Sequence, residues 1–438
     1  MDLVIAFLVF ALAMVCSLIW GGDYGMLGAL VIGLAAFYTV ARQRGFQAKA
    51  LVKMMGKGLR RSLIVVRVFV LIGLLTALWR SSGTIAFFVY HGVRLIPPSL
   101  FLLAAFLLAS LLSYALGTSF GIVGTVGVIL MTLARSGGVP PVMTAGAVLS
   151  GAYFGDRAAP ASSCANLVAT VTGTELYGNV KRMLRSAVLP MCLCVIFYGI
   201  LSVKNPLSAG ESALVGELAD AYRLSWLTAI PAVIMLILPL CKIEVRKAIL
   251  LSSLCAFAVT VFLQGMPITE ALKACVFGYR APQALADILS GGGLISMLKV
   301  AGIVALSGTY SGIFEGTEML SGVQDTLGRL TEKLGTFGVT LVTSAGVGAV
   351  FCNQTIGVMM VEQLLGPVYK KQNCTREELA LDISCSVVVM VGLCPWCIAC
   401  AVPLSMMGVG LGALPFAALL YLIPICRLAT KNLKKKAA

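Results

Sequence analysis

The sequence predicts an all-α polytopic membrane protein with roughly 10 to 13 transmembrane helices, some of them broken, in two inverted repeats. Three observations support this fold class. The 438 residues are 59% hydrophobic and only 12% charged, against about 25% charged residues in soluble domains. Several apolar runs approach the roughly 20 residues that cross a bilayer. Glycine, proline and polar clusters interrupt the apolar pattern in both halves of the chain.

The apolar runs begin at the N-terminus. Met1–Trp20 has no basic region before it and is followed by a second run, so we expect half of a helical hairpin rather than a cleaved signal peptide. Full spans and re-entrant hairpins look alike in hydropathy, which keeps the number of spans approximate. The other long runs are Gly25–Val40, Leu63–Trp79, Leu100–Leu116, Leu184–Val203 and Ala248–Leu263.

The net charge of +15 lies mainly in short loops beside the apolar runs and in the C-terminal tail. Basic loops of this kind are typical of the cytoplasmic side, so we expect a multi-pass protein of the cell (inner) membrane with both termini in the cytoplasm. A nucleic-acid patch would need a polar domain to display it, and we expect no nucleic-acid partner. The basic positions are Arg42, Arg44, Lys49, Lys53, Lys57, Arg60, Arg61, Lys181, Arg182, Arg185, Lys242, Arg246, Lys247, Arg427, Lys431 and Lys434–Lys436.

The longest polar connection divides the chain. It holds Glu211, Glu217 and Asp220 and is expected on the side of the membrane opposite the basic loops. We therefore expect a first transmembrane half at residues 1–204, a polar linker at 205–223 and a second transmembrane half at 224–438 with a basic C-terminal tail.

Cysteines are frequent, and the segment GLCPWCIACAVP at residues 392–403 spaces three of them closely. A thioredoxin-like CxxC pair needs a soluble βαβ context, and an iron–sulfur cluster needs a fourth thiolate; the chain offers neither. Cysteine in a membrane helix mainly packs as a small apolar residue. We expect no enzyme activity, no metal site and no cofactor other than Na+ or H+ as coupling ion.

The first broken region is residues 116–174. It contains Gly117-Thr118-Ser119-Phe120-Gly121, then Asp156-Arg157, then a Pro, Ser and Asn segment that ends at Asn166. Irregular backbone at membrane depth is tolerated only where it is buried in protein or lines a cavity. These residues therefore predict the interior of a transport site.

The second broken region is residues 302–412. It contains a Gly-Thr-x-Ser segment at 308–312 that we expect to match the first Gly-Thr-Ser turn, then Glu315, Cys352-Asn353-Gln354-Thr355, Asp382 and the cysteine segment. Interruptions at corresponding places in two halves indicate an inverted-repeat transporter, because half-helix ends can replace the hydration shell of an ion or substrate.

An ionisable side chain at membrane depth is a functional candidate. We expect Asp156 to be the carboxylate that binds a proton or cation. Arg157 is either an ion-pair partner or a ligand for a substrate carboxylate. For Asp382 and Glu315, a position at a helix end is the alternative to a role in the site. The expected neutral ligands are Thr118, Ser119, Ser163, Asn166 and Asn353.

The strings LGTSFGIVGTVGVIL and SGAYFGDRAAPASSCANLVAT resemble the NhaC family of Na+/H+ antiporters, and the resemblance extends over residues 71–412. Further matches are SGIFEGTEML, FCNQTIGVMM and CPWCIACAVPLSMMGVG. The resemblance implies inverted repeats with re-entrant hairpins and, in many members, a homodimer. It places family motif positions at Asp156, Asn166, Asn353 and Pro395-Trp396.

This chain departs from the family pattern at its polar motif. Where the family has Ser-Asp-Thr-Thr-Asn, residues 162–166 read Ser-Ser-Cys-Ala-Asn, and Cys397 stands where a polar Asn is usual. The family often has Glu-Asp and then Thr near Asp382, but residues 381–385 read Leu-Asp-Ile-Ser-Cys. Because Na+ prefers oxygen ligands, these departures favour an organic substrate more than the family pattern alone does.

Together these features predict a secondary transporter that exchanges Na+ or another monovalent cation for H+ by alternating access at a midplane site. The alternative is ion-coupled transport or exchange of a small organic acid or amino acid, which the family also includes. A channel would use similar elements, but the acid and the broken segments favour a carrier. The sequence GxxxxGK[ST] of a nucleotide-driven pump is absent.

Overall fold

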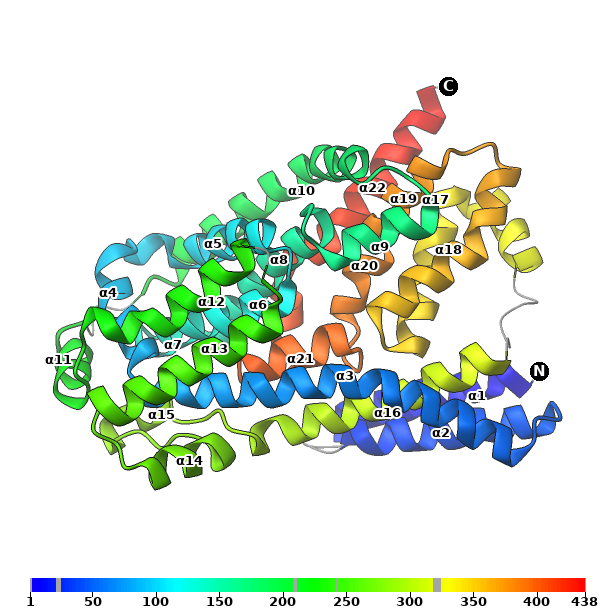
Figure 1. Ribbon diagram of the computed structural model, residues 1–438. Helices are drawn as coiled ribbons and strands as arrows, with labels where there is room; N and C mark the ends of the chain where they lie inside the picture. The colour runs from blue at the N-terminus through cyan, green and yellow to red at the C-terminus, as the bar shows by residue number, and fades with distance from the viewer. Residues whose placement is uncertain (1, 21–24, 208–210, 242, 318–323, 438) are drawn as a thin grey trace.

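The computed structural model describes residues 2–20, 25–207, 211–241, 243–317 and 324–437. Within these ranges the chain is helical and forms no β-strand, which confirms the all-α prediction (Figure 1). In the described part of the chain, seven helical segments are long and apolar enough to cross a membrane, or up to nine if two bent pairs each count as one span. The protein is a polytopic membrane protein; the figure of roughly 10 to 13 spans stays a prediction.

The first half begins with a pair of packed helices, α1 and α2, as predicted for the first two apolar runs. Its helices are α1 (Asp2–Trp20), α2 (Gly25–Gln43), α3 (Ala48–Ser81), α4 (Thr84–Leu95), α5 (Phe101–Leu116), α6 (Ser119–Ile122), α7 (Val128–Ser136), α8 (Pro141–Ala158), α9 (Ser163–Thr172) and α10 (Leu176–Lys204). The polar linker contains a helix of its own, α11 (Glu211–Ala221).

The second half contains several short helices between its long ones. Its helices are α12 (Ile230–Leu240), α13 (Val245–Ala258), α14 (Ile268–Phe277), α15 (Ala286–Leu289), α16 (Leu298–Thr317), α17 (Gln324–Phe351), α18 (Gln354–Lys371), α19 (Arg376–Cys385), α20 (Val387–Met390), α21 (Ile398–Met406) and α22 (Ala418–Ala437).

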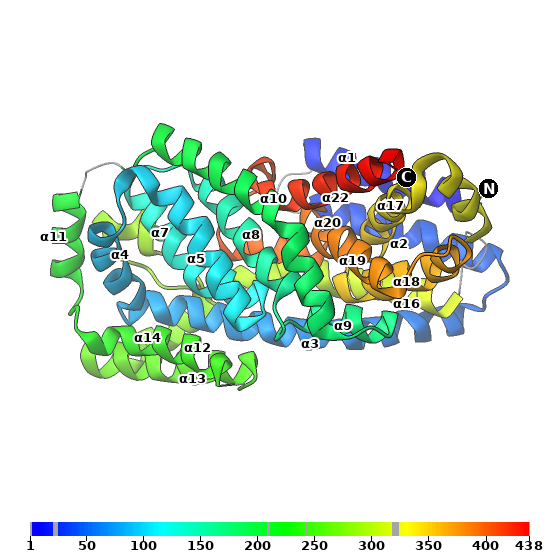
Figure 2. The same cartoon turned by 90° about the horizontal axis from the view of Figure 1, so that it is seen from above.

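The molecule is elongated, and its long helices run roughly along its length. In Figures 1 and 2, the start of α1 and the end of α22 lie toward one end, and α11 lies at the other. Helix α3 packs against α16 along one side, and α5 packs against α8. The contacts of α9 with α18 and α19 bring the broken regions of the two halves together.

Glycines allow α3 and α16 to approach closely. A Cβ atom on Gly58 would lie 2.0 Å from the carbonyl oxygen of Gly308, and one on Gly312 would lie 2.1 Å from that of Met54. Small residues at such crossings let helix backbones touch inside a membrane. The segment at 308–312 is therefore part of the continuous helix α16. The expectation that it forms a turn like Gly117–Gly121 was wrong, because its glycines serve helix packing.

We predict that Gly58→Ala destabilises the protein by about 1–3 kcal/mol, since the added methyl group meets backbone atoms that cannot rotate away. Gly56→Ala is the matched control on the same helix, because no atom lies within 4 Å of its Cβ position. Thermal unfolding of the purified protein in detergent measures both. Equal melting temperatures for the two variants would contradict this account of the α3–α16 contact.

Candidate functional site

Four interruptions of the helices meet in the interior of the protein. They lie between α5 and α6, between α8 and α9, between α17 and α18, and just before α21. These are the segments that the sequence predicted as broken. They form two pairs, one in each half, and each pair is held by close backbone contact.

In the first half, Gly117 allows the two breaks to touch. It has a φ of 67° at the end of α5, and a Cβ atom there would lie 2.6 Å from backbone atoms of Ala161 and Ser162. The Thr118 hydroxyl then accepts a hydrogen bond of 3.2 Å from the Gly121 amide and caps α6. Glycine is needed at position 117 for both the backbone angle and the contact.

In the second half, Cys352 takes the place of that glycine. It has a φ of 54°, which is uncommon for a residue with a side chain. Its carbonyl oxygen accepts a 3.1 Å hydrogen bond from the amide of Ile398, the first residue of α21. The Asn353 Oδ1 atom accepts bonds from the amides of Thr355 (2.9 Å) and Ile356 (3.3 Å) and so caps α18.

The backbone angles of the two pairs agree closely. The cap residues Thr118 and Asn353 have φ and ψ of −145° and 124°, and −139° and 124°. The caps of α9 and α21, Ser162 and Cys397, have −68° and 130°, and −71° and 143°. Extended caps of this kind are usual at helix starts, and Gln47 and Glu175 have similar angles. The more specific likeness is a residue with positive φ, Gly117 or Cys352, directly before one cap in each half.

Asp156 lies where the two pairs meet. It is 5% exposed and sits near the C-terminal end of α8. The Gln354 Nε2 atom, from the second half, donates to its Oδ2 atom at 3.3 Å. The hydroxyl groups of Ser119 and Ser162 lie beside it, and the Ser162 hydroxyl donates to the main-chain carbonyl oxygen of Asp156 at 2.5 Å. Among the described residues, none of the ion pairs includes this carboxylate.

Gln354 is the site residue that the prediction missed. It was part of the quoted motif, but only Asn353 was chosen. The structure uses the Asn353 side chain to cap α18, whereas the amide of Gln354 bridges Asp156 and the carbonyl oxygen of Val388 (2.9 Å). The sequence did offer a signal for this. Asn is a preferred helix-capping residue, so Asn353 is expected to cap the helix and Gln354 to be its first residue.

Helix α9 carries a polar stripe that leads away from Asp156. Ser163, Asn166 and Thr170 are exposed and lie on one face of this helix. The Asn166 Nδ2 atom donates to the carbonyl oxygens of Pro160 (3.0 Å) and Ser162 (2.7 Å), which are freed where α8 ends. Polar groups exposed at membrane depth indicate contact with water.

A cavity of about 890 Å³ lies at the far ends of α9 and α18. Its lining includes Thr172, Glu362, Lys370 and Arg376. The cavity is on the side toward which the polar stripe of α9 runs. The stripe and the cavity together lie between Asp156 and the end of the protein that carries the basic loop at 370–376.

Arg157 does not fill either predicted role. It is 1% exposed, and its donors are bonded to protein acceptors: Nε to the Ser384 carbonyl oxygen (3.0 Å), Nη1 to the Met183 carbonyl oxygen (3.2 Å) and Nη2 to Ser186 Oγ (2.6 Å) and Cys385 Sγ (3.1 Å). It therefore ties α8 to α10 and α19. The structure corrects both the ion pair with Asp156 and the ligand for a substrate carboxylate.

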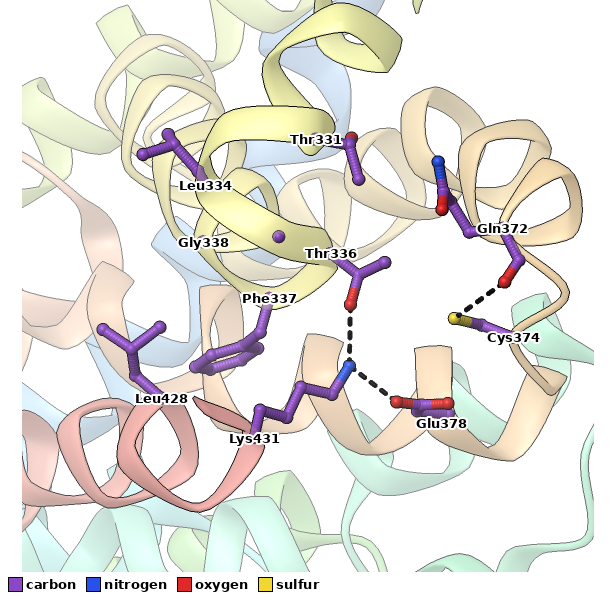
Figure 3. Close-up of a pocket in the computed structure, with 11 residues that line it drawn as sticks. Thr331, Leu334, Thr336, Phe337, Gly338, Gln372, Cys374, Glu378, Leu428 and Lys431 are labelled. Atoms are coloured by element: carbon purple, nitrogen blue, oxygen red, sulfur yellow. Dashed lines mark hydrogen bonds and ion pairs between the residues drawn. The ribbon is translucent and has the colours of Figure 1, made fainter. Parts of the chain in front are cut away.

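Asp382 belongs to a separate, structural network. It is fully buried and pairs with Arg427 (2.8 Å) and Lys431 (2.5 Å) of α22, while the Tyr369 hydroxyl donates to it at 2.7 Å. Figure 3 shows Lys431 also pointing to Thr336 and Glu378, at 3.0 Å and 2.7 Å, across a pocket of about 420 Å³. This network joins α19 to α22; it does not join Asp382 to Asp156.

The backbone of Glu315 is in α16, but its side chain lies outside the described residues. The cysteines at the breaks bond to backbone. Cys397 Sγ donates to the carbonyl oxygen of Gly348 (3.0 Å) and Cys352 Sγ to that of Ala349 (3.4 Å), both near the end of α17. Within the described part of the chain, no three His, Cys, Asp or Glu side chains are placed to hold a metal ion.

Comparison with known proteins identifies the class. The profile of the Na+/H+ antiporter family matches residues 2–165 and 151–429, so the chain belongs to this family and is a secondary transporter of the cation/H+ antiporter type. The family supports a multi-pass protein of the cell membrane and points to transport rather than catalysis.

Individual relatives show the range of the family. The chain is 27% identical to the Na+/H+ antiporter NhaC of Alkalihalophilus pseudofirmus, over 84% of this chain and 81% of that one. It is 25% identical to the malate-2H+/Na+-lactate antiporter of Bacillus subtilis, over 80% and 77%. It is 28% identical to the arginine/ornithine antiporter ArcD of Halobacterium salinarum, over 66% and 62%.

We predict that Arg157→Lys lowers the free energy of unfolding by about 2–4 kcal/mol, because an ammonium group cannot replace the four bonds of the guanidinium. Arg185→Lys, an exposed position on α10, should change stability by less than about 0.5 kcal/mol. Thermal unfolding measures both. If Arg157 instead binds substrate, Arg157→Lys would keep its melting temperature and lose transport.

Proposed function

We propose that Asp156 is the carboxylate that binds a monovalent cation and a proton in turn, with Na+ as the first candidate. A single observation carries this proposal: a buried carboxylate with no ion-pair partner among the described residues, bonded only to neutral donors. Burying an unpaired charge is unfavourable, and a bound proton or cation removes that penalty. Asp382, paired with two cations, has no such need.

The ligands available to a cation near Asp156 are few. Ser119, Ser162 and Gln354 supply oxygen atoms, and the carbonyl groups at the breaks supply more. Cys164 and Cys397 supply none of the oxygen that Na+ prefers. A second candidate function therefore stands beside the first: ion-coupled exchange of a small organic acid or amino acid, a class of solute that the names of two relatives contain.

We further propose that the two halves are inverted repeats that move relative to each other around this site. The matching backbone angles of Thr118 with Asn353, and of Ser162 with Cys397, support this. Counted back from the second pair of caps, the position of Asp156 corresponds to Val391 in the other half. The two proposed repeats therefore have similar backbone angles at their caps, but only the first has a carboxylate at this position. A homodimer, implied by the family resemblance, is proposed on that basis alone.

We place the cavity beside Glu362 and Arg376 on the cytoplasmic side, together with both termini. The basic residues of the 42–61 loop, the 370–376 loop and the end of α22 support this orientation. The start of α1 and the end of α22 lie at the same end of the molecule (Figures 1 and 2). The α9 stripe would then connect Asp156 to cytoplasmic water.

We predict that Asp156→Asn reduces Na+-driven proton movement in proteoliposomes to the level of protein-free liposomes. An amide neither releases a proton nor neutralises a bound cation. Asp220→Asn, an exposed acid on α11, should keep wild-type exchange. Exchange that stays pH-dependent in Asp156→Asn would remove Asp156 from the mechanism.

Competition for one carboxylate also predicts a pH dependence. In the range where the carboxylate is mostly protonated, the apparent KM for Na+ should rise about tenfold for each unit by which the pH falls, while the maximal rate stays constant. Initial rates at several Na+ concentrations and pH values measure this slope. A KM that is independent of pH, with a falling maximal rate, would show that proton and cation bind different groups.

A further inference from the structure

The guanidinium of Arg80 is buried, and one of its nitrogen atoms has no hydrogen-bond acceptor. Arg80 occupies the last turn of α3, where the chain bends by 63° into α4, and is 8% exposed. Its Nε atom has no hydrogen-bond partner, and Nη1 makes one long bond, 3.4 Å, to the carbonyl oxygen of Thr76. Arg157, with four acceptors, shows what a satisfied buried arginine looks like in the same protein.

The surroundings of Arg80 add positive charge. Arg135, at the end of α7, acts on it electrostatically and itself donates from Nη2 to the carbonyl oxygens of Met407 (2.9 Å) and Gly408 (3.1 Å). Tyr222 is the other titratable group that acts on Arg80, through its hydroxyl group. That hydroxyl donates to the Tyr279 hydroxyl at 3.0 Å. Within the described part of the chain, none of the ion pairs includes Arg80 or Arg135. The two arginines therefore add to each other's positive potential, and no carboxylate among the described side chains pairs with either of them.

Glycine backbone covers the guanidinium. Gly291 has a φ of 128°, and a Cβ atom there would lie 3.8 Å from the Cζ and Nε atoms of Arg80. The neighbouring Gly292 is packed against Ala77, where a Cβ atom would lie 2.5 Å from the backbone nitrogen. The backbone of these glycines therefore covers one face of the Arg80 guanidinium. The Nε atom, at the edge of the guanidinium, still has no hydrogen-bond acceptor.

A guanidinium group stays charged when it is buried. Burying it without a partner of opposite charge is strongly unfavourable, and a bound anion would supply that partner. The guanidinium's planar fork of donors suits a carboxylate, and a halide can accept the same N–H groups. The positive potential of Arg80 and Arg135, together with the neutral tyrosine hydroxyls, favours a small anion of single charge over a metal ion or a cationic solute.

We propose that Arg80 and Arg135 form a binding site for a small monovalent anion, a carboxylate or a halide, at the bend between α3 and α4. In Figure 1, α4 lies at the same end of the molecule as α11, away from the chain termini. The site therefore differs from the Asp156 site in position and in sign of charge. It goes beyond cation/H+ exchange, which does not require an anion.

Thermal unfolding of the full-length protein in detergent tests this site. The base buffer is choline HEPES, and choline chloride, choline acetate or choline lactate is titrated into it, so that Na+ is absent throughout. Wild-type protein should show a saturable rise in melting temperature of about 3 °C or more with at least one of these anions. Tighter half-saturation by acetate or lactate than by chloride indicates a carboxylate; the reverse order indicates a halide.

Variants separate the site from a general salt effect. Arg80→Gln should abolish the rise, and Arg135→Gln should raise the half-saturating concentration about tenfold. Arg67→Gln, an exposed arginine on the same helix, should behave like wild type. In the base buffer, where the bulky HEPES sulfonate is the only anion, Arg80→Gln should be at least as stable as wild type, because it removes an unpaired charge. A purely structural arginine would give the opposite result.

Three results would overturn the proposal: no saturable rise in wild type, an unchanged rise in Arg80→Gln, or equal rises in all variants. If Arg80→Gln does not fold, Arg80→Lys and Arg135→Gln decide the question, since wild-type half-saturation in both contradicts the site. Asp156→Asn should keep the anion-dependent rise. Its transport assay therefore tests the cation site independently of this one.

Discussion

The fold depends on one constraint, that backbone polar groups inside a membrane must find partners within the protein. Each helix break in this chain frees amide and carbonyl groups, and each break is packed against another break that uses them. Gly117 rests on Ala161 and Ser162, and the carbonyl oxygen of Cys352 accepts from Ile398. These contacts between breaks bring the residues that cap them into a single place.

Four buried ionisable groups show how differently a charge can be accommodated in this protein. Arg157 is surrounded by acceptors, and Asp382 is held by two cations and a tyrosine hydroxyl. Asp156 has only neutral donors, and the Nε atom of Arg80 has no acceptor. The first two are complete and stabilise the fold. The other two lack a partner of opposite charge, which a bound ion would supply.

The sequence predicted the helical class, the membrane location and the positions of the broken segments, because apolar length and glycine, proline and polar clusters are local properties. It also singled out Asp156 as the most informative acid. It did not separate Arg157 and Asp382 from the site, since their partners on α10, α19 and α22 are distant in sequence. The 308–312 segment resembled a turn in composition, and only the presence of Gly58 opposite it shows why it is helical. Gln354 was overlooked because side-chain direction depends on the helix that begins there.

The unequal halves have a consequence for energetics. In the proposed inverted repeat, Val391 stands at the position of Asp156, so the second half has no carboxylate there. A carrier that offers one acid to both ions returns one proton for each monovalent cation and moves no net charge in a cycle. Such an exchanger would respond to the two concentration gradients alone, and the voltage across the membrane would neither drive it nor oppose it. A chain with carboxylates in both halves would be free to couple unequal numbers of ions and so to draw on the membrane potential.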